Sequence, residues 1–358
     1  MPGVYISYPF CAQKCSYCNF ASGVFPKELE ARYQERLLRE IHETKWQWQP
    51  ETLYLGGGTP SLWPLDDLRR VLEAIPAKPW KEATMEAAPG SLTKERVAAW
   101  REFGINRVSL GVQSFIEGEI RKTGRKHSAA IVESDVELLR IHGIDSINLD
   151  LISGLAGQNQ ASWEQSLDEL LRLKVPHASV YILEVDEDSR LGKEVLFNGQ
   201  RYGAREIPSD EDQAAFYERA HERLAEQGIQ RYEISNFARP GDESLHNLKY
   251  WRLEPYLGFG ADAHSYDGQY RWQNSDDPKT YVESNQVERT AADVAGEPYW
   301  VGLRLSEGMP DNGEHREAID RMIHDGLLEA LNGRIRLTPR GVLLSNEVFQ
   351  EFLTDGND

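Results

Sequence analysis

The sequence is poor in cysteine, and its few cysteines are unevenly placed. Only three occur among 358 residues, all within one short window, at Cys11, Cys15 and Cys18. Three cysteines cannot form a disulfide framework, which excludes the small secreted scaffolds that depend on several bridges. Their scarcity and clustering favour metal binding or redox chemistry in a reducing compartment.

Long hydrophobic runs and an excess of positive charge are also lacking. No stretch approaches the roughly 18 apolar residues of a membrane-spanning helix, and the first residues show neither the basic nor the apolar part of a signal peptide. We therefore expect a cytoplasmic protein without stable membrane insertion. With 40 Lys and Arg against 58 Asp and Glu, the formal net charge is −18, which argues against binding to nucleic acid or anionic membranes.

Short β-branched runs alternate with longer helical patterns over the first two thirds of the chain. This order predicts an α/β fold of six strand-then-helix units, either an open doubly wound sheet or a partial (β/α)6 TIM-like barrel. The strands read as apolar throughout, as expected where both faces of a sheet are covered. Strands are expected at 3–7, 52–55, 83–87, 107–111, 146–151 and 179–183. Helices are expected from 26 to about 48, at 66–75, 93–103 and 128–141, from 162, where Ser and Gln have a capping-box spacing, and at 210–226.

Shifts in composition divide the chain into three parts. We expect a barrel over 1–230 with the cysteine loop at 8–20, a barrel extension rich in aromatic residues over 231–296, and a small winged-helix-like domain over 297–358. In this last domain we expect a helix at 318–325, strands near 326–328 and 334–337, and a helix at 341–352. It holds 12 acidic and 6 basic residues, whereas a module that reads DNA grooves is normally basic. We therefore interpret it as a packing module.

The cysteine loop has the spacing C-x3-C-x2-C, which puts three thiolates on one tight loop. Ordinary iron–sulfur clusters take four cysteines, so three ligands leave one iron of a four-iron cluster open to bind a substrate or cofactor. A structural zinc site is the alternative, but such sites usually combine two separated pairs of ligands, and no His lies within twenty residues of the cysteines. Unrelated buried cysteines are a second alternative, which the clustering disfavours.

This spacing, with Tyr17 directly before the last cysteine, resembles the radical S-adenosylmethionine (SAM) superfamily. The resemblance implies a [4Fe-4S] cluster held by Cys11, Cys15 and Cys18, with SAM chelated at the open iron, where an electron from the cluster can split the sulfonium. The cofactor then supplies the hard chemistry, and the protein supplies position and shielding. Aromatic residues of the loop such as Phe20 are the expected shield.

Glycines and polar groups gather where the predicted strands end. The segment Gly56–Pro60 (GGGTP) follows the second strand, where glycine lets a ligand reach backbone donors, although alone it is equally well a turn. Glu86, Gln113 and Asp150 stand at the ends of three further strands, where barrel active sites are built. For each carboxylate alone, capping of the next helix is an equally good interpretation.

Five segments extend the resemblance over nearly the whole chain to the oxygen-independent coproporphyrinogen III oxidase-like branch of the superfamily. These segments are LYLGGGTPSL, MEAAPGSLT, INRVSLGVQSF, SINLDLISGL and RYEISNFARPG. The resemblance implies one set of residues in contact with SAM or the cluster, with Glu86 and Asp150 suited to the ribose hydroxyls and Arg125 to an anionic group. The set is Tyr5, Tyr17, Gly57, Gly58, Thr59, Glu86, Gln113, Arg125 and Asp150. Ser7, Ala88 and Ala156 depart from the residues common in this branch but remove no predicted ligand.

Two functions remain within this branch. One is the oxidative decarboxylation of two propionates of coproporphyrinogen III, and the other is that of HemW-type haem chaperones, which bind haem and transfer it to acceptor proteins. Three features favour the chaperone. Phe20 stands where the enzyme has a fourth cysteine, the long N-terminal arm of the enzyme has no counterpart, and 246–251 (HNLKYW) matches the H-N-x-x-Y-W pattern of the chaperones. Whether the protein is also an enzyme stays open.

The HNLKYW hexapeptide also suggests where haem binds. His246 has an imidazole suited to haem iron, and Tyr250 and Trp251 suit stacking on a flat macrocycle. Alternatively, the aromatic residues only pack the segment on the barrel and His246 only makes a hydrogen bond, with His264 as a rival ligand. The expected partners are haem, SAM and haem-accepting proteins, together with a second copy of the chain in a homodimer.

Overall fold

The computed structural model describes residues 2–76 and 79–353. Its parallel strands are short: β1 (Gly3–Tyr8), β2 (Thr52–Gly57), β3 (Glu82–Ala87), β4 (Arg107–Gln113), β5 (Ser146–Ser153), β6 (His177–Ile182) and β9 (Tyr256–Phe259). The remaining strands are β7 (Gln230–Arg231), β8 (Asn236–Ala238), β10 (His264–Tyr266), β11 (Tyr270–Gln273), β12 (Thr290–Ala291), β13 (Met309–Pro310), β14 (Leu328–Leu331) and β15 (Arg334–Leu337).

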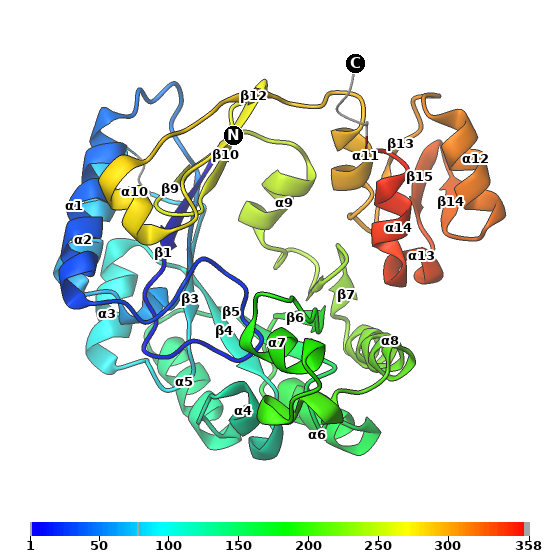
Figure 1. Cartoon of the computed structure of the whole chain (residues 1–358), viewed down its shortest axis with the longest axis horizontal. Helices are drawn as coiled ribbons and strands as arrows, with labels where there is room; N and C mark the ends of the chain where they lie inside the picture. The colour runs from blue at the N-terminus through cyan, green and yellow to red at the C-terminus, as the bar shows by residue number, and fades with distance from the viewer. Residues whose placement is uncertain (1, 77–78, 354–358) are drawn as a thin grey trace.

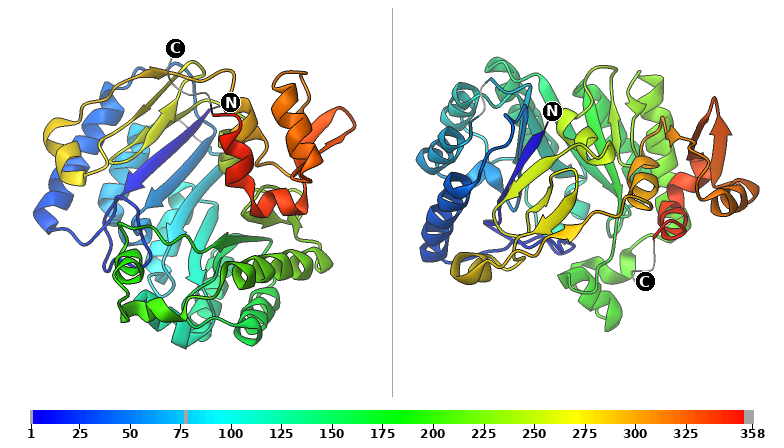
Figure 2. Two further views of the ribbon diagram at one scale, coloured as in Figure 1. Left: turned by 45° about the vertical axis from the view of Figure 1, so that its right-hand side comes forward. Right: turned by 90° about the horizontal axis from the view of Figure 1, so that it is seen from above.

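Twelve strands form one curved sheet in the order β12-β11-β10-β9-β1-β2-β3-β4-β5-β6-β8-β7. The strands from β9 through β1 to β6 run parallel, and both edges are antiparallel. Consecutive strands β1 to β6 are neighbours, without the reversal of order that defines a doubly wound sheet. The predicted parallel sheet is therefore confirmed, and its curvature around an open interior makes it a partial barrel (Figures 1 and 2).

Helices cover the outer side of the parallel strands (Figure 2). These covering helices are α1 (Lys27–Glu43), α2 (Leu65–Ala74), α3 (Lys94–Phe103), α5 (Ala129–Ile141), α6 (Gln160–Arg172) and α8 (Asp210–Glu226). The short helices α4 (Glu117–Thr123) and α7 (Arg190–Leu196) lie beside the cysteine loop, and the 3-10 turns η1 (Pro60–Leu62) and η2 (Arg201–Glu206) lie in connecting segments. The predicted helices occur in the predicted order. The short helices α4 and α7 were not predicted, because they have too few residues to show a clear period.

The helix predicted from Ser162 begins earlier than the sequence suggested. The Asn159 side chain accepts hydrogen bonds from Ala161 N and Ser162 N, and the Ser162 hydroxyl bonds back to Asn159 N. Asn159 is therefore the N-cap, and Ser162 closes the capping box from inside the helix rather than opening it.

The parallel strands alternate between an apolar outer side and a polar inner side. Leu53, Met85 and Val108 are fully buried in the core under the helices, whereas their chain neighbours Tyr54 and Glu86 hydrogen-bond one another across β2 and β3. The prediction of strands apolar on both faces was therefore wrong. We call the enclosed space the lumen. It is lined by Tyr5, Thr52, Tyr54, Glu82, Thr84, Glu86, Arg107, Ser109, Asn148, Asp150, His177 and Ser179.

Beyond β8 the chain returns to the barrel and then leaves it. Helix α9 (Leu245–Trp251) contains the HNLKYW hexapeptide, for which no helix was predicted, and α10 (Pro278–Ser284) packs beside α1 (Figure 1). The last residues form a small module of α11 (Glu297–Gly302), α12 (Arg316–His324), α13 (Pro339–Leu343) and α14 (Ser345–Gln350) around the sheet β13-β15-β14. The single helix predicted over 341–352 divides into α13 and α14 at Leu344, where φ of −110° and ψ of 28° leave the helical region.

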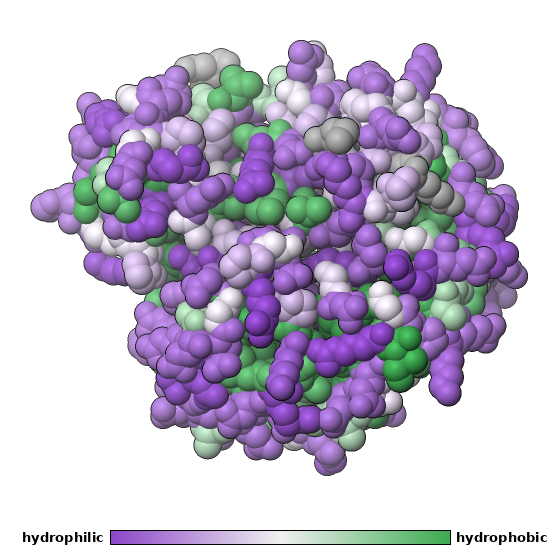
Figure 3. All heavy atoms as spheres, turned by 180° about the vertical axis from the view of Figure 1, so that it is seen from behind, coloured by the Kyte–Doolittle hydropathy of each residue, from purple (hydrophilic) through white to green (hydrophobic). Residues whose placement is uncertain are grey.

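The outer surface is mostly polar on the face shown in Figure 3. Figure 3 shows one face of the molecule as mostly hydrophilic, with apolar side chains gathered in a few patches. Within the described residues, 2–76 and 79–353, no helix has the length and apolar character needed to span a bilayer.

Candidate metal centre and cofactor site

The three cysteines lie on the loop after β1, at the carboxyl end of the barrel. A backbone hydrogen bond from Cys11 N to Gly23 O (2.8 Å) closes the base of this loop. All three thiols are free and part-buried. Burial raises the pKa of the Cys11 thiol, and the charges of Cys15 and Cys18 raise this pKa further, so the three sulfur atoms are electrostatic neighbours.

The loop fits an iron–sulfur cluster better than it fits a single ion. In the part of the chain that the structure describes, no three His, Cys, Asp or Glu side chains converge closely enough to hold one metal ion. The described residues therefore show no preformed site for a single ion. A four-iron cluster does not need such convergence, because each thiolate binds a different iron.

Two helices that the sequence did not reveal hold the cysteine loop in place. Ser16 donates from its backbone N to Thr123 O (3.0 Å) and from its hydroxyl to Lys122 O (3.1 Å), at the end of α4. On its other side, the Ser16 carbonyl accepts from Leu191 N of α7 (2.8 Å). These bonds fix the residue next to Cys15 and so position the loop through its backbone.

Arg125 and Gln113 link the loop to β4. The Arg125 guanidinium donates from Nε to Cys15 Sγ (3.2 Å) and from Nη1 to Gly111 O. Gln113 follows an irregular stretch of β4, adopts a positive φ of 69° and is 8% exposed. Its Oε1 is buried and has no partner among the described residues. A strained residue with an orphaned acceptor is typical of a ligand site, and this acceptor fits a donor group such as an amine.

The backbone of the glycine-rich stretch Gly56–Pro60 forms hydrogen bonds with the cysteine loop. Gly58 N donates to Tyr8 O (2.8 Å) and Thr59 N to Phe10 O (3.0 Å). A Cβ atom at Gly58 would lie 2.7 Å from the carbonyl carbon of Pro9, so only glycine permits this close approach. The backbone donors of Gly58 and Thr59 are thus occupied by the loop, and the expectation of bare donors along the whole stretch was wrong.

Two carboxylates face the lumen below the loop. Glu86 accepts from Tyr54 Oη (2.9 Å), and burial raises its pKa to about 7, although Tyr54 and the Gly57 amide oppose that rise. Asp150 accepts from Asn148 Nδ2 (2.7 Å) and from the Ser109 hydroxyl (3.2 Å). Burial raises the pKa of Asp150 too. Both side chains therefore act as positioned acceptors in the lumen and do not cap helices, which answers the alternative left open by the sequence.

The two tyrosines predicted to contact the cofactor lie on either side of this space. The Tyr5 ring stacks near that of Tyr54, with 6.1 Å between centroids, and lines the lumen. Tyr17 packs against a small apolar cluster that includes Leu183 and Leu191, and the charges of Arg125 and Cys15 act on it. The charge of Asp150 acts on both Glu86 and Arg125, and Arg125 contacts Cys15, which links the carboxylates of the lumen to the cysteine loop.

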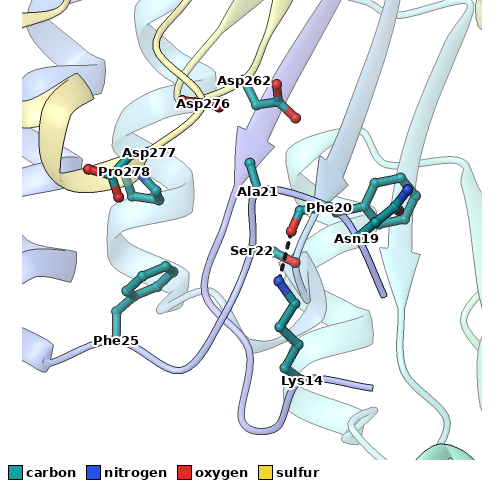
Figure 4. Close-up of a pocket in the computed structure, with 10 residues that line it drawn as sticks. All are labelled: Lys14, Asn19, Phe20, Ala21, Ser22, Phe25, Asp262, Asp276, Asp277 and Pro278. Carbon is teal, nitrogen blue, oxygen red and sulfur yellow. Dashed lines mark hydrogen bonds between the residues drawn. The ribbon is translucent and has the colours of Figure 1, made fainter. Parts of the chain in front are cut away.

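Phe20 points away from this site. Its side chain is 64% exposed, so it does not shield the sulfur atoms in the way that the sequence suggested. It lines a shallow pocket beside the loop, opposite Asp262, Asp276 and Asp277, and Lys14 Nζ donates to its carbonyl (3.1 Å; Figure 4).

His246 lies at the opposite, amino end of the barrel. It is fully buried, with Nδ1 bonded to Thr52 Oγ1 (3.0 Å) and Nε2 to Tyr250 Oη (2.7 Å). Both ring nitrogens are thus occupied, and burial lowers the pKa of the imidazole to about 3. The structure therefore does not support His246 as an iron ligand and favours the packing role. His264, the rival histidine, is exposed at the start of β10.

The helix that carries His246 is itself tied to the strands. The Glu82 carboxylate at the start of β3 accepts from the backbone N of Leu245 and of His246 (2.9 Å each) and from the Ser244 hydroxyl (3.1 Å). Lys249 Nζ contacts Glu51 at 2.7 Å. These contacts make α9 a structural plug at the amino end of the lumen.

Comparison with known proteins agrees with this geometry. The family model described as Radical SAM superfamily matches residues 5–170. The chain is 33% identical to the protein named heme chaperone HemW of Lactococcus lactis, over 98% of this chain and 97% of that one. It is also 33% identical to the heme chaperone HemW of Bacillus subtilis, over 99% of both. The solved coproporphyrinogen III oxidase HemN of Escherichia coli has the same fold, with a TM-score of 0.82 at 22% identity over 98% of this chain and 90% of that one.

Proposed function

The chain belongs to the HemW family within the radical SAM superfamily, and on that basis we propose that it binds haem and transfers it to acceptor proteins. The observation that carries this proposal is the identity of about one third over the full length with relatives named as haem chaperones. Transfer of haem to acceptor proteins and the formation of a homodimer are predictions.

Membership of the superfamily implies a [4Fe-4S] cluster and SAM. We propose Cys11, Cys15 and Cys18 as the cluster ligands, because their thiols are free and neighbour one another on a loop whose backbone is fixed. When bound, such a cluster supplies an electron for cleavage of the SAM sulfonium. Arg125 lies against Cys15, where its Nε donates to Sγ at 3.2 Å.

The residues around the loop are proposed to hold SAM by hydrogen bonds. Gln113 Oε1 is an unpaired acceptor for an N–H group, and Glu86 and Asp150 are acceptors suited to ribose hydroxyls. Tyr5 and Tyr17 provide ring surfaces, while Gly57, Gly58 and Thr59 bring the end of β2 up to the cysteine loop. Arg125 is already engaged by Cys15 and Gly111, so we assign it a role on the cluster side of SAM.

Oxidative decarboxylation of coproporphyrinogen III is the second candidate. The fold of the solved oxidase extends over almost the whole chain, but likeness at 22% identity speaks for the fold alone. Phe20, at the position where the resemblance places a fourth cysteine in the oxidase, favours the chaperone.

One experiment separates the two functions. The protein is reconstituted anaerobically with iron and sulfide, SAM and a reductant are added, and haem binding and coproporphyrinogen decarboxylation are measured on the same preparation. The chaperone predicts stoichiometric haem binding without decarboxylation. Turnover to protoporphyrinogen, or a failure to bind haem, would overturn the proposal.

A further inference from the structure

Arg304 closes one side of the lumen from the C-terminal module. The extended segment after α11 pairs with the segment before β8, where Ser306 N donates to Tyr232 O (2.9 Å) and Leu305 bridges to Glu233. This pairing places Arg304 among groups at the carboxyl end of β6, since the charges that act on it belong to Glu233, Glu184 and Tyr181.

Two aromatic rings hold the Arg304 guanidinium in position. Its central carbon lies 4.4 Å from the centroid of Trp251, at the end of α9, and 5.8 Å from that of Phe349 in α14. Contacts of this kind fix the guanidinium plane but leave its N–H groups without acceptors. Within residues 2–76 and 79–353, no hydrogen bond or ion pair satisfies this side chain, and its Nε is buried without a partner.

The neighbouring carboxylate of Glu233 forms no ion pair with Arg304 in the described part of the chain. Glu233 Oε1 accepts from Ser235 N (3.0 Å) and from the Asn236 amide, while Oε2 is buried without a partner among the described residues. Burial raises the pKa of Glu233, and the charge of Arg304 opposes that rise without an ion pair between the two side chains. The charges of Glu233 and Glu184 act on Arg304 without a salt bridge. A part-buried guanidinium whose N–H groups lack acceptors among the described residues costs free energy, and an anionic group from a ligand would recover that cost.

The surroundings of Arg304 suit a flat ring that carries its acidic groups at one edge. Tyr181 is 41% exposed, and yet burial raises its pKa, as expected for a ring that faces the lumen and not the outer surface. Tyr181 and Trp251 offer aromatic faces for stacking. Glu86 on β3 and Asp150 on β5 also line the lumen and would repel carboxylates. An acidic ligand edge is therefore directed toward the positive charge of Arg304.

We propose that Arg304 binds a carboxylate of the ligand, which is a haem propionate under the function proposed above, on which this assignment rests. The planar fork of the guanidinium matches a carboxylate through two parallel hydrogen bonds. The C-terminal module thus contributes a binding residue to the lumen in addition to packing beside it.

The test compares haem with haem dimethyl ester, whose propionates carry no charge. Both are titrated against wild-type protein and against Arg304→Gln, which keeps the polar shape but removes the charge. Arg252→Gln is the matched control, because Arg252 is exposed, adjoins Trp251 and pairs only loosely with Glu307 (3.4 Å). We expect Arg304→Gln to weaken haem binding about tenfold, the loss of one charged hydrogen-bonding pair, and to leave ester binding unchanged. Arg252→Gln should bind both as wild type does.

The outcomes separate this assignment from the proposed function. Unchanged haem affinity in Arg304→Gln, while wild type binds haem, would refute the role of Arg304 alone. An equal loss for haem and ester would also refute it, because the side chain would then act only on structure. A wild-type protein that binds neither ligand would refute the haem function itself. Arg304→Lys keeps the positive charge but not the planar fork. It should therefore bind haem more tightly than Arg304→Gln does and less tightly than wild type, and it should bind the ester as both of them do.

Discussion

The two ends of the barrel use their motif residues in opposite ways. At the carboxyl end, the cysteine loop is held through Cys11 N and the N, O and Oγ atoms of Ser16. The three sulfur atoms form no disulfide, and their contacts are long ones, from Arg125 to Cys15 (3.2 Å) and between Ser22 and Cys18 (3.9 Å). At the amino end, the side chains of the HNLKYW helix are themselves engaged, and His246 has both ring nitrogens occupied. A motif residue whose functional atoms are satisfied by the protein supports architecture, and one whose functional atoms are free is available to a ligand.

The largest effect is expected when one of the three cysteine sulfur atoms is removed. Cys15→Ala should abolish reconstitution of the four-iron cluster, because one of only three protein ligands is lost and Arg125 loses the sulfur it contacts. Iron and sulfide content and the visible absorption of the cluster measure the effect. Phe20→Ala is the control on the same loop and should retain a full complement, since its side chain is 64% exposed. A Cys15→Ala protein with full iron and sulfide would refute the three-ligand site.

At the amino end of the barrel, removal of the His246 side chain should lower the stability of the protein and should not lower its affinity for haem. His246→Ala leaves Thr52 and Tyr250 without a partner in a fully buried site. We expect the free energy of unfolding, measured by urea denaturation, to fall by about 2–4 kcal/mol. His264→Ala, at an exposed position, should change it by less than about 0.5 kcal/mol.

Haem affinity completes the test of His246. Under conditions where the variant is folded, it should bind haem as wild type does, because the imidazole has no free nitrogen for an iron. If His246→Ala kept its stability but lost haem binding, the contrast between the two ends would fail.

The sequence predicted the fold because periodicity and strand order are local signals. Parallel strands and most helices were recovered, and Glu86 and Asp150 do lie close enough in the lumen for their charges to interact. The polar lumen was overlooked, although the alternation of apolar and polar residues is visible in strands such as β5 (SINLDLIS). A short strand that alternates weakly is easily read as apolar throughout.

What the sequence could not give were contacts between distant segments. No local pattern states that Ser16 bonds to Thr123 and Leu191, or that Thr52 occupies the imidazole of His246. The pairing of Ser306 with Tyr232, which brings Arg304 to the lumen, depends on a sequence separation far beyond any periodic signal. These long-range contacts decide which motif residues remain free.

A smaller effect is expected in the pH dependence of the unfolding free energy, through Glu86 in the lumen. The folded-state pKa of Glu86, about 7, lies above its ordinary value of 4.5, so folding takes up a proton there. The associated stability is complete below about pH 4 and is lost as pH rises toward 7, by up to about 1 kcal/mol per pH unit. Glu86→Gln retains a partner for Tyr54 without titrating, so its unfolding free energy should depend less on pH between 5 and 7. Parallel curves for wild type and variant would contradict this, and Glu73→Gln on the exposed face of α2 should leave the curve unchanged.

The smallest effect is expected at Phe20, where the sequence distinguishes the two branches most sharply. Phe20→Cys introduces a fourth cysteine at the position where the resemblance places one in the oxidase. The native side chain is 64% exposed and its carbonyl, which accepts from Lys14 Nζ, survives the substitution. The unfolding free energy should therefore change by less than about 0.5 kcal/mol, with iron content unchanged and no decarboxylation gained. Decarboxylation by Phe20→Cys would show that this one position decides the function, whereas its absence would show that a fourth cysteine alone is not sufficient for it.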